Sequence, residues 1–143
     1  MQITLQSRLT DKLSTALGVS NASDELSLAL ADRSALGARL VKTLAAERLI
    51  APADLYRVIP RRTWLRRKGE GTLTSAEFDG LLRLVRLQLL AELVFGDVER
   101  ARDWLHTGKK RLGGASPVDF ASHMLGYEAV ENWLYEIDEG YFG

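Results

Sequence analysis

The stretch LIAPADLYRVIPRRTWLRRK, residues 49–68, decides the fold of the N-terminal half of the chain. Pro52 suits the first turn of a short helix, where the missing N–H of proline is not needed. Pro60 disfavours helical geometry at Ile59, so the chain turns there and a second helix begins at about Arg61. The stretch therefore predicts two short helices joined by a tight turn. The inward face of the first is expected to consist of Leu55, Val58 and Ile59.

The second of these helices is strongly basic, with five cations within residues 61–68. Residues four apart share a helical face, so Arg62 and Arg66 can point the same way. A basic run by itself is usually a solvated face, but this one directly follows a helix-turn break, where a recognition helix lies. Trp64 and Leu65 are expected to anchor the helix to a core. The predicted DNA-binding residues are Arg57, Arg61, Arg62, Thr63, Arg66, Arg67 and Lys68.

On the N-terminal side of this stretch the pattern is weaker. Residues 1–22 mix polar residues and glycine with scattered apolar ones, and we expect this variable segment to be partly ordered at best. Ser23, followed by two acids, is a helix-capping residue that predicts a helix to about Ala31. A second helix, at about residues 34–47, places Leu36, Leu40 and Leu44 on one face.

On the C-terminal side, apolar residues recur with helical spacing between glycine and proline breaks. Helices are expected at about residues 75–95, 98–106 and 127–138, with a helix start at Ser116-Pro117 and a break at Gly126. Residues 108–114 are expected to form a loop. The predicted fold is all-α, with a helix-turn-helix DNA-binding unit at residues 23–71 and a small helical C-terminal domain at residues 72–143.

Charge divides the chain in the same way, although the formal net charge is zero. Residues 1–68 carry 12 Lys/Arg against 6 Asp/Glu, whereas residues 69–143 carry 7 against 13. From Leu112 onward there is no Lys or Arg. Such asymmetry predicts two different partners, a polyanion for the first part and a cationic surface for the second.

Several other classes of function lack support. The chain has no cysteine, and His106 and His123 lie in separate segments, so no metal site is expected. The glycine-rich stretches lack the order of a phosphate-binding loop, and no catalytic constellation stands out. The expectation is a protein that is not an enzyme and needs no cofactor. No secretory signal or apolar run of membrane-spanning length is present, which favours a cytoplasmic protein without membrane contact.

The order of residues from about Leu49 to Gly140 resembles the Xre/MbcA/ParS antitoxin family. Ile-Pro-Arg-Arg-Thr-Trp-Leu-Arg-Arg at 59–67 resembles the family's helix-turn-helix, and residues 73–77 resemble the start of its central helix. The spacing of the family's C-terminal domain is reproduced by Ala91, residues 94–97, Ala101, residues 104–105, residues 112–114, Pro117, Gly126, Val130, Leu134, Ile137 and Gly140.

The resemblance implies an antitoxin paired with a RES-domain toxin that consumes NAD, either by degrading it or by transferring its ADP-ribose. It implies that the C-terminal domain covers the toxin's active site with the tail near the NAD pocket, and that the N-terminal helices bind the operator of the shared operon. An acidic, aromatic tail suits a pocket that uses cations to hold a pyrophosphate. The predicted toxin-binding residues are Tyr135, Glu136, Asp138, Glu139, Gly140, Tyr141, Phe142 and Gly143.

A homodimer within the toxin complex is also expected, because helix-turn-helix proteins usually read paired half-sites. The helix predicted at 75–95 has a wide apolar surface, and Leu82 and Leu89 are the predicted seam. Two alternatives stay open. The first is a ligand-responsive transcriptional regulator, which would need a cavity. The second is a partitioning adaptor, because some members of the family that the sequence resembles carry that name.

Overall fold

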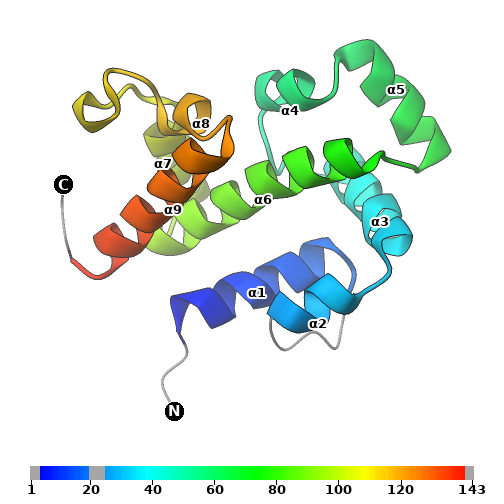
Figure 1. The fold of residues 1–143 in the computed structure, drawn as a ribbon, viewed down its shortest axis with the longest axis horizontal. Helices are drawn as coiled ribbons and strands as arrows, with labels where there is room; N and C mark the ends of the chain where they lie inside the picture. Colours follow the sequence, from blue (N-terminus) through cyan, green and yellow to red (C-terminus); the bar gives the residue numbers. More distant parts are fainter. Residues whose placement is uncertain (1–3, 20–24, 141–143) are drawn as a thin grey trace. The chain divides into compact units, whose positions relative to one another are not determined.

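In the computed structural model, which describes residues 4–19 and 25–140, all the regular structure is helical (Figure 1). The chain divides into two compact units, Met1–Arg86 and Leu87–Gly143. The all-α prediction is confirmed. The helices are α1 (Leu5–Ala16), α2 (Glu25–Leu30), α3 (Arg33–Ala46), α4 (Pro52–Val58), α5 (Arg61–Glu70), α6 (Ser75–Phe95), α7 (Val98–His106), the short 3-10 helix η1 (Lys110–Leu112), α8 (Pro117–Phe120) and α9 (Met124–Asp138).

Helix α1 is more ordered than the sequence analysis expected of this segment. Thr4 caps it by accepting a hydrogen bond from the backbone N–H of Ser7 at 3.0 Å. Its buried side is a leucine row at four-residue spacing, Leu9, Leu13 and Leu17, which the scattered polar residues concealed in the sequence. The Thr43 hydroxyl of α3 donates to the Ala16 carbonyl at 2.8 Å. The segment is therefore part of the core of the N-terminal unit.

Helices α2 and α3 lie close to their predicted ranges. The predicted cap of α2, Ser23, lies outside the described residues. Helix α3 begins one residue earlier than expected, because the Asp32 side chain accepts from the backbone N–H of Ser34 at 3.0 Å. Leu36 and Leu40 are buried as predicted, and Leu44 is half-buried.

Helices α4 and α5 form the predicted pair, separated by the turn at Ile59-Pro60. Helix α5 ends where Gly71 adopts φ +72° and donates its N–H to the Arg67 carbonyl at 2.7 Å. Trp64 is buried as expected, but Leu65 is 52% exposed, so its expected role as a core anchor is wrong. Neighbouring helical residues point about 100° apart, and in α5 the inward direction belongs to Trp64.

In the C-terminal unit, the end of α6 and the whole of α7 match their predicted limits. The Asp97 side chain caps α7 by accepting from the Arg100 N–H at 2.8 Å. The ring of Trp104 lies 5.0 Å from that of Trp133 and 5.5 Å from that of Phe95, centroid to centroid. This aromatic cluster joins α7 to α9 and to the end of α6.

Helix α9 begins three residues before its predicted start, so the expected break at Gly126 is wrong. The His123 imidazole caps the helix by accepting from the Gly126 N–H at 3.1 Å. Gly126 is buried in the first turn, where a Cβ would overlap the carbonyl oxygen of Phe120 in α8. This glycine permits close helix packing instead of ending a helix.

Candidate functional site

The basic face of α5 keeps part of its charge free. Arg61, Arg62 and Lys68 are exposed, and among the described residues no ion pair involves them. Thr63, one of the predicted DNA-binding residues, is half-buried. Three unneutralised cations on one short helix are suited to bind phosphate groups.

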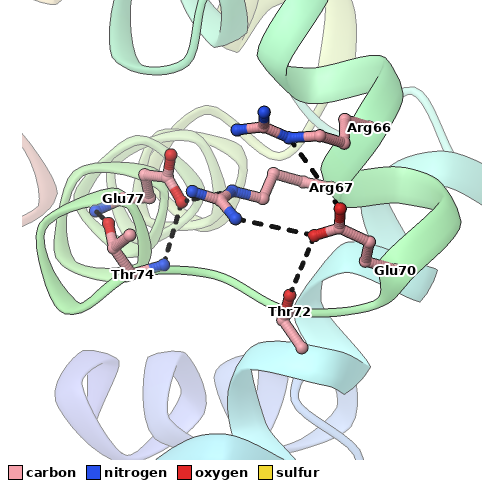
Figure 2. Close-up of polar contacts among 6 residues, drawn as sticks. All are labelled: Arg66, Arg67, Glu70, Thr72, Thr74 and Glu77. Atoms are coloured by element: carbon pink, nitrogen blue, oxygen red, sulfur yellow. Dashed lines mark hydrogen bonds and ion pairs between the residues drawn. The ribbon is translucent and has the colours of Figure 1, made fainter.

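Arg67, also on α5, lies against the start of α6 (Figure 2). Its Nε lies 3.0 Å from Glu77 Oε1 and its Nη1 lies 3.6 Å from Glu70 Oε2. Its side chain is 19% exposed and that of Glu77 is 15% exposed. Arg67 is therefore engaged within the protein, unlike Arg61, Arg62 and Lys68.

Glu77 holds a second set of contacts at the same place. Its carboxylate accepts from the Thr74 backbone N–H at 2.9 Å, and the Thr74 hydroxyl accepts from the Glu77 N–H at 3.2 Å (Figure 2). This reciprocal pair is a capping box that starts α6. One carboxylate thus both caps α6 and pairs with the cation from α5, which ties the orientation of α5 to the first turn of α6.

The two remaining predicted DNA-binding arginines are partly engaged. Arg57 Nη2 lies 3.0 Å from Asp54 Oδ1, and the Asp54 side chain is buried. Arg66 Nε lies 3.8 Å from Glu70 Oε1 across an exposed surface. Exposed ion pairs contribute little to stability, so Arg66 can exchange Glu70 for a phosphate at small cost.

The predicted toxin-binding residues gather at the end of α9. Asp138, Glu139 and Gly140 are exposed, and Tyr135 and Glu136 are half-buried. The other three, Tyr141, Phe142 and Gly143, lie outside the described residues.

Glu136 is paired within the C-terminal unit. Arg111 Nη2 lies 3.0 Å from Glu136 Oε2, and the Arg111 guanidinium lies 4.6 Å from the Trp133 ring centroid. Lys109 approaches Trp104 in the same manner, at 5.4 Å. These contacts hold the loop at 108–114 against α7 and α9.

Met124 and Leu125, at the start of α9, are not among the functional residues predicted from the sequence. Both are large apolar residues with exposed fractions of 72% and 75%. In the sequence they stand directly before Gly126, where a break was expected. The signal that could have identified them is the capping residue His123, which places them in the first helical turn.

The two residues of the predicted dimer seam, Leu82 and Leu89, differ in how much of the side chain is exposed. Leu89 is 6% exposed, so little of it is left to contact a second copy. Leu82 is half-buried and lines a cleft of about 370 Å³ between α1, α2, α3 and α6 in the N-terminal unit. Leu13, Leu17, Leu36 and Phe78 contribute to the apolar lining of this cleft.

The described part of the chain lacks two further kinds of feature. No group of three or more His, Cys, Asp or Glu side chains is arranged to hold a metal ion there. None of the helices there combines the length and the apolar character that crossing a membrane requires.

Comparison with known proteins assigns the C-terminal unit to a family. Residues 90–140 match the model of the antitoxin Xre/MbcA/ParS C-terminal toxin-binding domain. A curated relative, Antitoxin Xre of Pseudomonas putida, is 35% identical over 103 residues, which are 71% of this chain and 64% of the relative. The chain thus spans slightly less than two thirds of that relative's length. Over residues 90–140, which include α7–α9, the chain is therefore similar to the toxin-binding domain of the Xre/MbcA/ParS antitoxins, and over 71% of its length it is similar to an Xre-type antitoxin.

Proposed function

We propose that this protein neutralises a RES-domain toxin through its C-terminal unit and represses the operon of the pair through α4 and α5. The match of residues 90–140 to a toxin-binding domain carries the proposal. The exposed cations of α5 support its second half, because they suit operator DNA. Both actions belong in the cytoplasm, where operator DNA and NAD are available.

The toxin half of the proposal is that the end of α9 covers the active site of an NAD-consuming enzyme. Asp138 and Glu139 are exposed there, and residues 112–143 carry six acids and no Lys or Arg. Such a surface complements a pocket whose cations hold the phosphates of NAD. Co-expression with the proposed RES-domain toxin tests it: growth and cellular NAD are expected to recover. Continued NAD loss in the presence of a soluble complex would contradict the proposed neutralisation.

The tail contributes directly to this covering in our proposal. Deleting residues 140–143 is expected to leave the complex intact while the toxin again consumes NAD, because a plug has been removed from the pocket. Complex formation by gel filtration and NAD in cells are the two measurements. If the truncated chain protects NAD as well as the full chain, inhibition comes from another part of the C-terminal unit.

The operator half is tested by Arg61→Ala combined with Arg62→Ala. The double variant is expected to bind its own promoter fragment at least about tenfold more weakly, because a lost bidentate base contact alone costs about 1–3 kcal/mol. Toxin neutralisation should persist. Lys12→Ala, an exposed cation on α1, is the matched control. Unchanged promoter affinity in a mobility-shift assay would remove Arg61 and Arg62 from the DNA interface.

A second candidate, a ligand-responsive regulator, is favoured by one observation. The cleft of about 370 Å³ in the N-terminal unit has a mainly apolar lining, with the Arg33–Asp79 ion pair at 2.7 Å among its residues. This volume is within the range of small-molecule sites. A metabolite that changes promoter affinity in the absence of any toxin would favour this candidate over the antitoxin.

A further inference from the structure

Met124 and Leu125 form an exposed apolar pair in the C-terminal unit. Single exposed apolar residues are common on protein surfaces and need no explanation. These two are adjacent, both in the first turn of α9, and more exposed than Val98, another exposed apolar residue of this unit, at 43%. They also lie within the segment 90–140 that matches a toxin-binding domain.

The local structure holds this pair in a defined position. The His123 side chain caps α9 directly before Met124, and its ring lies 6.0 Å from that of Phe120. Gly126 follows directly after Leu125 and packs without a Cβ against the Phe120 carbonyl. Helix α8, which carries this carbonyl, buries Pro117 and Val118. Anchors on a rigid corner lose little conformational entropy on binding.

The charges around the pair indicate which partner fits. Glu128, four residues after Met124, is exposed on the adjoining turn. No Lys or Arg occurs between Leu112 and the end of the chain, so the segment that carries the pair offers no cation to the phosphates of DNA. A second copy bound by the same surface would bring Glu128 close to its own counterpart, which is unfavourable. A different protein, with an apolar depression bordered by cations, satisfies both the apolar pair and the acids.

We propose that Met124 and Leu125 are apolar anchors for the toxin, inserted into such a depression at the start of α9. The proposal rests on the proposed antitoxin function and adds a contact surface to it. This surface is separate from the tail, since α9 has 15 residues and therefore spans about 22 Å. Both ends of the helix fit within one interface of ordinary size.

The test compares two variants of the full-length chain. Met124→Ser with Leu125→Ser removes the proposed anchors, and Leu26→Ser with Leu30→Ser removes an equally exposed pair from α2, with exposed fractions of 65% and 77%. The probe is the RES-domain toxin of the proposed function, with its active site inactivated. Because truncating an interface anchor weakens binding by about tenfold or more, we expect that loss in the first variant and no change in the second.

Further measurements separate the possible failures. Circular dichroism, thermal unfolding and promoter affinity should be unchanged in both variants, and Met124→Leu should keep toxin affinity. If the serine variant unfolds early, Met124→Ala with Leu125→Ala replaces it, since alanine favours the helix. Wild-type affinity in the anchor variant would overturn the inference and leave the antitoxin function standing. A wild-type chain that does not bind the probe would overturn both.

Discussion

At the scale of single residues, Gly126 shows how a neighbouring element reverses a rule of local structure. Alanine normally stabilises a helix by about 1 kcal/mol over glycine. In Gly126→Ala the new Cβ would overlap the Phe120 carbonyl. We therefore expect the free energy of unfolding to fall by about 2–3 kcal/mol. Urea unfolding followed by the fluorescence of Trp104 and Trp133 measures it.

The matched control is Gly69→Ala, within α5, where no atom lies within 4 Å of the added Cβ. That change is expected to stabilise the protein by about 0.5–1 kcal/mol. Equal effects at the two glycines would contradict the close approach of α8 and α9.

Arg67 and Arg62, both on α5, differ in whether the side chain is paired within the protein. Arg67→Met leaves Glu77, whose side chain is 15% exposed, without its cation. We expect the free energy of unfolding to fall by about 1–2 kcal/mol, which lies between the effects of breaking an exposed and a buried ion pair. Arg62→Met, on the same helix, should change stability by less than about 0.5 kcal/mol. Urea unfolding followed by tryptophan fluorescence compares the two. If both variants are as stable as the wild type, Arg67 does not position α5.

At the scale of elements, α1 belongs to the core, although its segment was expected to be partly ordered at best. Leu13→Ala empties a buried position and should lower the free energy of unfolding by about 2–5 kcal/mol. Lys12→Ala, exposed on the same helix, should have little effect. Denaturant unfolding distinguishes them. A stable Leu13→Ala protein would mean that α1 does not belong to the core.

The pair α4 and α5 behaves differently, because its limits follow from local chemistry. Pro52 and Pro60 determine where each helix can start, and Gly71 with positive φ ends the second. Residues far away in the chain are not needed for these boundaries. This is why the predicted limits agree with the structure here. At α9 the predicted start was wrong because Gly126 was interpreted as a helix break, whereas it packs against the Phe120 carbonyl of α8.

At the scale of the whole molecule, the charge asymmetry persists at the structural boundary. Residues 1–86 carry 14 Lys/Arg against 9 Asp/Glu, and residues 87–143 carry 5 against 10. Operator affinity should therefore fall steeply with salt, with a slope in log–log form of about −0.9 per phosphate contacted.

The salt dependence also tests the expected dimer. If two copies bind two half-sites, Arg62→Ala should make the magnitude of the log–log salt slope smaller by about two. If a single copy binds, the magnitude should fall by about one. Fluorescence anisotropy of a labelled promoter fragment at several salt concentrations gives the slope, and light scattering of the free protein at micromolar concentration gives its mass. A monomeric mass together with a change of one would contradict the dimer.

The sequence by itself determined the helical class, most helix limits and the position of the basic helix, because periodicity, proline, glycine and capping residues act over a few neighbours. Tertiary structure decided which residues of the basic run remain unpaired and which apolar residues of the helices remain exposed. Arg62 is free and Arg67 is paired, although both belong to one basic run. Leu9 is buried and Leu125 is exposed, although both are helical leucines. These outcomes depend on which side chains of other helices lie against each position, and the periodic pattern within one helix does not contain that information.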